Sequence, residues 1–407
     1  MFHIIKPGSR FDIIGKQKSL MMLSLVLVLA SIGVIVGIGP KYGIDFKGGS
    51  DIILGFKGSV TAEEVRNAAR TSVGFADASV QRFGAEDKNQ FLVQTSEVSV
   101  VNKTIIDAIK VNLGGDAAVK RDSWSPEEPD RYDFTLNAAK PLEELVQAAE
   151  KAGIEGAKAE PFGVASDNTF VLRFPGLQSR INKGFYAAMP KLYPSPEESA
   201  SATNKSTGVI RLETVGSRVG DQLRTDGLTA FLLSLVAILL YIALRFDIRY
   251  APGAVVAIFH DVLIAFGILT ILKIEINLPI LAAALTIVGY SLNDTIVVFD
   301  RIRENYAAGH GGNNLPDVTN TSINETLSRT LITSLTTFLA VAVIAALGSG
   351  LIVNFSITLI IGVVVGTYSS IFVASPILLI MDRWVSSRQQ ARALRRPLNS
   401  EPAEPSV

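Results

Sequence analysis

The sequence predicts a polytopic α-helical membrane protein of six transmembrane helices, with a large α+β insert between the first and second helix. Of its 407 residues, 48% are hydrophobic and only 19% are charged, whereas soluble domains carry about 25% charged residues. The mean hydropathy is +0.35. The apolar residues gather in separate long runs, so a membrane part and a polar part can be distinguished in the sequence.

Six apolar runs are long enough to cross a membrane, since a bilayer core needs about 20 consecutive apolar residues. One run lies near the N-terminus, and the other five follow one another closely after residue 228. The runs are 20–38, 228–244, 251–272, 280–299, 331–347 and 355–381. The last run is longer than one crossing needs, which predicts a tilted or extended helix.

The first run has two interpretations. Lys6, Arg10, Lys16 and Lys18 precede it, as basic residues precede the apolar part of a signal peptide. The run is nevertheless longer than that part usually is, and no small-residue cleavage site follows it. We therefore favour an uncleaved membrane anchor.

The distribution of basic residues predicts the orientation, because short cytoplasmic loops are rich in Lys and Arg. Basic residues are frequent in 1–19, in the loop after the second run, in 301–329 and in 382–407. The alternate loops contain only Lys273 in one case and no basic residue in the other. We predict that both termini are cytoplasmic in a cytoplasmic (inner) membrane, and that the insert, 39–226, is periplasmic.

The insert contains an internal repeat at an offset of 79 or 80 residues. Matching pairs are Glu63-Glu64 with Glu143-Glu144, Gly74 with Gly153, Phe83-Gly84 with Phe162-Gly163, Asn89 with Asn168, and Asn102-Lys103 with Asn182-Lys183. We predict a first copy at about 44–122 and a second at about 131–216, joined by a linker at 123–129. Each copy has the strand and helix order β-α-β-β-α-β, which makes two tandem ferredoxin-like modules.

The insert has no His, so a nucleophile–His–acid set is excluded there. One interpretation is two purely structural modules. The other, which we favour, is that the helix-free face of a four-stranded sheet binds a partner chain. The segment 194–208 is predicted to be a flexible loop because it is rich in Ser, Pro and Thr.

Ionisable residues at membrane depth are costly and point to function. Asp261 lies near the middle of the third run, and a carboxyl there that is uncharged part of the time can take and release protons. The alternative is a carboxylate held in a permanent ion pair or in a hydrogen bond to a neighbouring helix. Asn293 and Asp294 lie in the fourth run, and Asp300 and Arg301 either continue a relay along the helix or simply end the span. The proton-pathway candidates are Asp261, Asn293, Asp294 and Arg301, with His260 and Asp300 as weaker candidates.

Other chemistry is excluded or not supported. The chain has no Cys and only three His, and no phosphate-binding glycine-rich loop with its Lys. We expect no metal, no cofactor and no covalent catalysis. The formal net charge is zero, which gives no bias toward nucleic acid. A membrane gradient is a better energy source, since one charge crossing 100 mV releases about 2.3 kcal/mol.

Five segments carry a resemblance to a known family. They are FDIIGK at 11–16, GIDFKGG at 43–49, ETVG at 213–216, GYSLNDTIVVFDRIREN at 289–305 and SRTLITS at 328–334. In these segments the chain resembles the SecF subunits of the bacterial Sec protein-export machinery, in the SecD/SecF branch of the resistance-nodulation-division superfamily. The resemblance covers about 10–56 and 209–385.

The resemblance implies partners and a mechanism. SecD would supply six more helices beside the SecYEG channel, with the SecA motor and YajC-like proteins as further partners and an unfolded preprotein as substrate. It also implies that Asp261, Asn293, Asp294, Asp300 and Arg301 match family positions linked to proton passage. The family usually has one outer module, and this sequence has two. The alternatives are a small-molecule or lipid exporter of the same superfamily, and a membrane scaffold that transports nothing.

Overall fold

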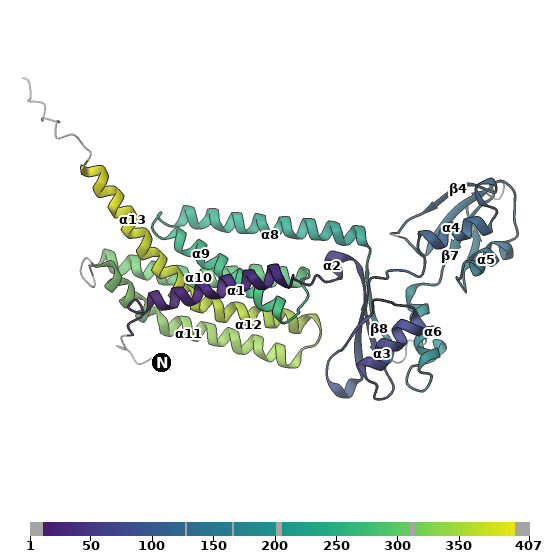
Figure 1. The fold of residues 1–407 in the computed structure, drawn as a ribbon, viewed down its shortest axis with the longest axis horizontal. Helices are drawn as coiled ribbons and strands as arrows, with labels where there is room; N and C mark the ends of the chain where they lie inside the picture. Colours follow the sequence, from purple (N-terminus) through teal and green to yellow (C-terminus); the bar gives the residue numbers. More distant parts are fainter. Residues whose placement is uncertain (1–10, 127, 165–166, 201–205, 310–313, 395–407) are drawn as a thin grey trace, which may run out of the picture. The chain divides into compact units, whose positions relative to one another are not determined.

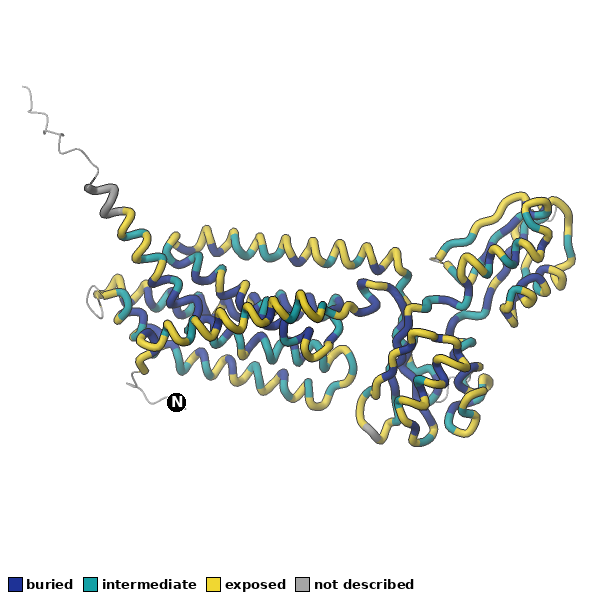
Figure 2. Tube along the Cα trace, viewed as in Figure 1, coloured by how far each residue is buried: buried dark blue, intermediate teal, exposed yellow. Residues whose placement is uncertain are grey.

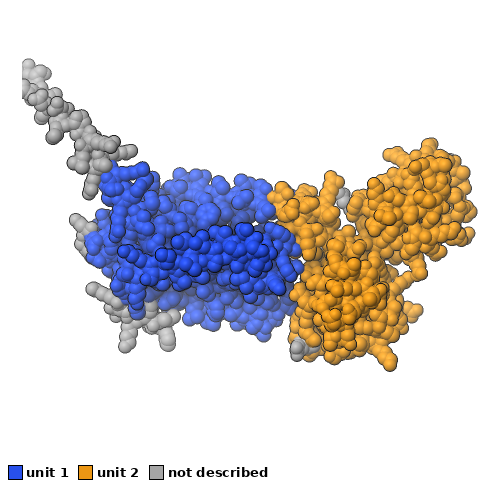
Figure 3. Space-filling view, viewed as in Figure 1, with its two compact units in different colours: residues 1–42, 226–407 blue, residues 43–225 orange. Residues whose placement is uncertain are grey.

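The structure, a computed structural model, describes residues 11–126, 128–164, 167–200, 206–309 and 314–394. The chain divides into two compact units, Met1–Tyr42 with Asp226–Val407, and Gly43–Thr225 (Figure 3). The first unit contains the transmembrane helices and the second is the insert. Residues 1–10 of the predicted cytoplasmic segment, and the tail residues 395–407, lie outside the described residues.

Six helices in the described ranges are long and apolar enough to cross a membrane, as predicted (Figure 1). The sixth consists of α12, a π-helical turn at Ser370–Ala374, and α13. The helices are α1 (Gln17–Gly37), α8 (Ser217–Arg245), α9 (Ala251–Ile271), α10 (Leu278–Ala307), α11 (Leu315–Leu347), α12 (Leu351–Ser369) and α13 (Ser375–Leu394). The chain is therefore a multi-pass membrane protein.

Much of the predicted loop 301–329 is helical, which corrects the prediction. α10 continues to Ala307 and α11 begins at Leu315. The predicted tail is likewise helical as far as Leu394. An apolar run shows only which part of a helix lies in hydrocarbon, and polar residues with good helix propensity continue the same helix beyond it.

The centre of the helical unit is formed by α9, α10 and α12, whose residues are largely buried (Figure 2). Far fewer residues are buried in the membrane-spanning parts of α1, α8 and α11. Apolar side chains on these outer helices are expected in a bilayer, where lipid takes the place of water. Among the described residues, the buried carboxylates of the bundle, Asp261 and Asp294, lie on the central helices α9 and α10, whereas α11 contributes buried hydroxyls such as Thr330 and Ser334.

The insert contains two four-stranded antiparallel sheets, in the orders β2-β3-β1-β8 and β4-β5-β7-β6. The strands are β1 (Gly49–Gly55), β2 (Ser79–Arg82), β3 (Gln90–Thr95), β4 (Val119–Trp124), β5 (Arg131–Leu136), β6 (Lys158–Pro161), β7 (Thr169–Arg173) and β8 (Gly208–Val215). The main helices are α3 (Ala62–Ala68), α4 (Lys103–Asn112), α5 (Leu142–Lys151) and α6 (Leu177–Ala188), with the short helices α2 (Ile44–Lys47) and α7 (Pro196–Ala200).

The repeat itself is visible in the backbone. Glu63-Glu64 and Glu143-Glu144 occupy the first turns of α3 and α5. Asn89 and Asn168 both have positive φ, at 45° and 47°, immediately before β3 and β7. The Asn102-Lys103 match is not equivalent, however, because Asn102 caps the start of α4 whereas Asn182 is buried within α6.

The predicted copy boundaries, 44–122 and 131–216, are wrong. β8 pairs with β1, and β4 pairs with β5. The first module is therefore β1-α3-β2-β3 completed by α6 and β8, and its core includes Ile181 and Phe185 of α6. The second module, α4-β4-β5-α5-β6-β7, lies between β3 and α6, and its core includes Ile106 and Ile109 of α4.

Each module keeps the ferredoxin-like strand order, but its last helix and strand differ from those predicted. The pair α6 and β8 completes the first module, and the pair α4 and β4 belongs to the second. The predicted linker is instead the loop of a β4–β5 hairpin, in which Trp124 Nε1 donates to the carbonyl of Pro129 at 3.2 Å. Antiparallel strands joined by a short loop pair directly with each other. This short connection holds β4 beside β5 and leaves β1 to be completed by β8.

Candidate functional site: a buried carboxyl cluster between helices

Asp261 of α9 is completely buried and is surrounded by side chains from three helices. Its Oδ1 lies 2.8 Å from Nδ1 of His260, and its Oδ2 accepts a hydrogen bond of 2.8 Å from Oγ of Ser369 on α12. Oγ of Ser291 on α10 donates to the same Oδ2. Within the described part of the chain no Lys or Arg pairs with the carboxyl, and His260 pairs with it as an ion only when the imidazole is protonated. The hydrogen bonds from Ser291 and Ser369 are those to neighbouring helices that the structural alternative includes.

Glycines on α12 let this cluster form. A Cβ at Gly362 would lie 2.0 Å from Ile287 of α10, and a Cβ at Gly366 would lie 3.0 Å from Cβ of Ser291. The helices can therefore pack closely only because these positions lack side chains. This contact lets Ser291 of α10 and Ser369 of α12 donate to the same oxygen, Oδ2 of Asp261.

The π-helical turn Ser370–Ala374 begins directly after Ser369. Directly after it, Oγ of Ser375 donates back to the carbonyl of Ser370 at 3.2 Å. Such single π-turns widen a helix locally and occur frequently at functional sites. Here the turn separates the Ser369 end of α12 from α13.

Asp294 of α10 forms a second buried carboxyl, one turn from Ser291, but it faces α11. Ser334 of α11 lies beside this carboxyl, and the charge of Arg329 acts on it from the same helix. Oγ of Ser334 also lies 2.7 Å from Oγ1 of Thr367 on α12. Oδ2 of Asp294 is buried and has no hydrogen-bond partner in the described ranges.

The structure therefore joins Asp261 and His260 in one cluster, and it places Asp294 in a second buried site, one turn from Ser291 along α10. The sequence analysis did not select Arg329 or Ser334 as site residues. The sequence feature that could have identified them is the cluster of Thr and Ser residues at 330–337, directly after a basic residue. Such hydroxyls are equally typical of helix packing in a membrane, so the pattern alone does not predict a site.

The other candidates lie elsewhere. Asn293 is exposed. Asp300 pairs with Arg245 at 3.5 Å, and Arg301 pairs with Glu325 at 2.6 Å and with Glu304 at 2.7 Å. These contacts connect the ends of helices, and none links Asp300 or Arg301 to Asp294.

His260 extends the cluster toward α1. Its ring stacks on Tyr368 with centroids 6.1 Å apart, and its Nε2 is buried without a hydrogen-bond partner among the described residues. The hydroxyl of Tyr368 donates to the carbonyl of Leu20 at 2.9 Å and accepts from Ser24 at 3.1 Å. Within the described residues, no group of three or more His, Asp or Glu could hold a metal ion.

Comparisons with known proteins agree on one family. Residues 196–384 match the family model described as protein export membrane protein SecD/SecF, C-terminal. The chain is 35% identical to the protein translocase subunit SecF of Koribacter versatilis, over 94% of this chain and 95% of that protein. It is 33% identical to the SecF of Vibrio alginolyticus, over 93% and 92%.

The solved structures give the same result. The crystal structure of SecDF from Thermus thermophilus, a translocon-associated membrane protein, matches with a TM-score of 0.63 and 27% identity, over 93% of this chain. This chain spans 40% of the length of that SecDF chain. On the full-length similarity to curated relatives and the agreement of fold, the chain belongs to the SecF family of protein translocase subunits.

Proposed function

We propose that the chain is an accessory subunit of the Sec protein translocase which, together with SecD, uses the proton motive force to promote preprotein translocation across the cytoplasmic membrane. The family membership supports the role in translocation. The SecDF match covers nearly all of this chain and less than half of the SecDF chain, which supports a SecD partner. SecYEG, SecA and YajC-like proteins are proposed as further partners, and both termini are proposed to be cytoplasmic.

The observation that carries the proton coupling is the environment of Asp261. The carboxyl is fully buried at membrane depth and is held by two hydroxyls and one imidazole. Serine hydroxyls rotate and can either donate to a carboxylate or accept from a carboxylic acid. The same cage therefore accommodates both protonation states, which a Lys or Arg partner would not allow.

Asp294 is the second proposed proton carrier. It lies on the same helix as Ser291, and the hydroxyls of Ser334 and Thr367 connect α11 and α12 beside it. A change of charge at either carboxyl alters which hydroxyls donate, and so alters the contacts among α9, α10, α11 and α12. Arg301 and Asp300 are proposed to hold the ends of the helices during this change, and Asn293 to contribute to the route from its exposed position.

The test is the substitution Asp261→Asn, which keeps the shape and most hydrogen bonds but cannot ionise. In membrane vesicles that contain the complete translocase, we expect the gradient-dependent part of preprotein translocation to be lost. The part that persists in the presence of an uncoupler should remain. Asp317→Asn, at an exposed carboxyl that bonds Asn314 at the start of α11, is the matched control and should behave as the wild type.

A variant Asp261→Asn that translocates preprotein at the normal rate and keeps the normal sensitivity to uncoupler would refute the proton assignment. Accumulation of the chain in the membrane at wild-type levels, together with co-isolation of its partner, distinguishes a loss of coupling from a loss of folding.

A further inference from the structure

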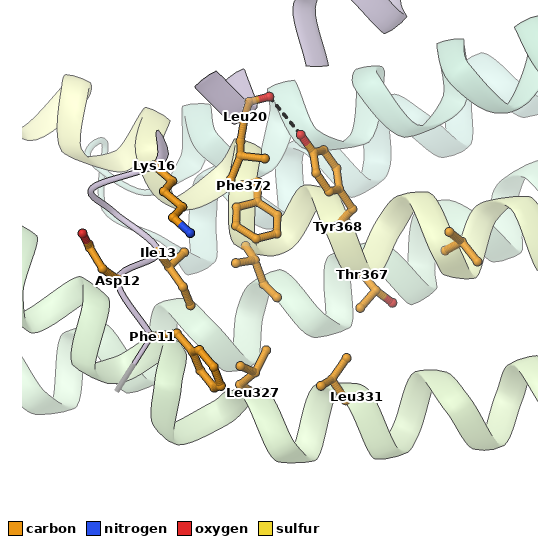
Figure 4. A pocket seen from close by; sticks show the side chains of 12 residues that line it. Phe11, Asp12, Ile13, Lys16, Leu20, Leu327, Leu331, Thr367, Tyr368 and Phe372 are labelled. Atoms are coloured by element: carbon orange, nitrogen blue, oxygen red, sulfur yellow. Dashed lines mark hydrogen bonds between the residues drawn. The ribbon is translucent and has the colours of Figure 1, made fainter. Parts of the chain in front are cut away.

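A cavity of about 550 Å³ lies on the helical unit, and Asp261, His260 and Asp294 are not among the residues that line it. It is bounded by the segment that precedes α1, by α11 and by α12 (Figure 4). This volume is within the range of about 300–1,000 Å³ found for small-molecule sites. Its walls are mainly apolar, with Leu20, Leu331, Val364 and Phe372 among them.

One wall is a non-helical segment fixed by side chains of α11. The amide of Phe11 donates to Oδ1 of Asn324 at 2.8 Å, and the amide of Ile13 donates to Oδ1 of Asn320 at 2.9 Å. Nδ2 of Asn320 and of Asn324 each donate to the carbonyl of Phe11, at 3.0 and 2.9 Å. Irregular backbone survives at a membrane only when its polar groups are satisfied in this way. Because Ile13 is also buried in the core of the bundle, the wall is a built part of the cavity.

The cavity has a cation at this wall. Lys16 lines it and forms no ion pair with any described residue. The other charged lining residue is Asp12, whose Oδ1 accepts the amide of Gly15 at 2.7 Å within the turn. The turn thus holds the Asp12 carboxylate by Oδ1, and no ion pair joins it to Lys16 among the described residues, so the ammonium is available to an anionic ligand.

We propose that this cavity binds an anionic phospholipid, with an acyl chain between α11 and α12 and the phosphate at Lys16. A ligand that satisfies the site needs a long apolar part joined to an anion, and basic pockets between transmembrane helices recognise lipid head groups. The bilayer supplies such a molecule at high local concentration. A transmembrane helix of another protein would fill the apolar walls but leave Lys16 without an anion.

The position of the cavity gives the lipid an effect on the carboxyl cluster. Tyr368 lines the cavity, and its ring stacks on that of His260, the neighbour of Asp261. An acyl chain in the cavity restricts the rotation of Tyr368 and so supports the orientation of His260.

The proposal can be tested by titrating the purified, delipidated full-length protein with phosphatidylglycerol or phosphatidylcholine and measuring bound lipid by native mass spectrometry. Lys16→Gln should weaken phosphatidylglycerol binding about fivefold, which corresponds to about 1 kcal/mol for one Lys. It should leave phosphatidylcholine binding unchanged. Lys18→Gln removes the same charge from a residue outside the cavity lining and should have no effect on the tightest site.

Val364→Trp fills the cavity from an exposed position, so the protein should still fold, which its thermal unfolding will show. This variant should lose the tightest bound phosphatidylglycerol. The proposal is overturned if Lys16→Gln and Lys18→Gln have equal effects, or if Val364→Trp retains lipid as the wild type does. It is also overturned if Val364→Trp keeps its lipid but loses a co-isolating membrane protein, since the cavity would then belong to a protein interface.

Discussion

At the scale of single residues, the chain uses carboxylates in two opposite ways. Asp261 in the bundle has no cationic partner in the described structure and is surrounded by groups that can reverse their hydrogen bonds. Asp77 in the insert accepts from Oγ1 of Thr95 at 2.6 Å and from the amide of Ser96 at 2.8 Å. Donors fixed in this way favour a permanent charge. The first arrangement suits a group that changes state, and the second suits an anchor at the end of β3.

Asp77 gives a prediction about pH. Burial by itself raises the pKa of Asp77, but the hydrogen bonds from Thr95 and Ser96 outweigh it and lower the pKa. Because the folded pKa is below the unfolded one, the stabilisation is fully present above the unfolded value of about 3.9. It is lost as the pH falls through the folded value.

Asp77→Asn should therefore lower the free energy of unfolding of the insert by roughly 0.5–1 kcal/mol at pH 7, because the residue is exposed and solvent screens its charge, and by less at pH 3. Thermal unfolding of residues 43–225, followed by circular dichroism at both pH values, measures this difference. Asp107→Asn, at an exposed position of α4, is the control. An equal loss of stability at both pH values would show that the charge of Asp77 is not involved.

At the scale of elements, the packing of α12 against α10 positions the carboxyl cluster. Gly362 and Gly366 are small residues four apart, a spacing that is typical of helix packing in membranes but does not identify the helix opposite. The approach of Ile287 to Gly362 and of Ser291 to Gly366 could not be predicted, since the sequence does not state which helix lies opposite.

Adding a methyl group at Gly362 should therefore be costly. Gly362→Ala is expected to destabilise the bundle by about 1–3 kcal/mol through overpacking, because its Cβ would overlap Ile287. Gly289→Ala on α10 is the matched control, since nothing lies within 4 Å of its Cβ. Thermal unfolding of the detergent-solubilised protein measures both, and equal behaviour of the two variants would contradict the close contact.

The same limit explains which site residues the sequence could supply. Asp261, His260 and Asp294 were predicted because a charged residue in an apolar run is conspicuous. Ser369 and Ser334 were missed because a hydroxyl in a transmembrane helix is ordinary. Asp300 and Arg301 were conspicuous for the same reason as Asp294, yet their partners are Arg245 and Glu325 at the ends of helices.

At the scale of the whole molecule, the six spans and the two sheets of the insert could be predicted, but the assignment of helices and strands to modules could not. The repeated pattern is satisfied equally when α4 and β4 complete the first copy or the second. The short β4–β5 connection decides between these arrangements. This connection joins one predicted copy to the next, so aligning the two copies with each other gives no information about it.

This arrangement predicts the result of two deletions. Removing residues 97–175 and joining the ends with a short flexible linker should leave the first module folded, because β1, α3, β2, β3, α6 and β8 all remain. Removing residues 125–207, most of the second copy predicted from the repeat, takes away α6 and should unfold the insert. Limited proteolysis of the membrane-embedded variants distinguishes the two, and resistance of the second variant alone would mean that the modules are not exchanged.

The second module is connected to the first by two chain segments, one after β3 and one before α6. A mechanical force on the second module is therefore divided between these two segments. One segment ends at β3, an inner strand of the first sheet, and the other ends at α6, which packs against that module's core. Two connections restrict rotation of the second module relative to the first more than one connection would. A force on the second module therefore acts on elements in the interior of the first module and not on a chain terminus.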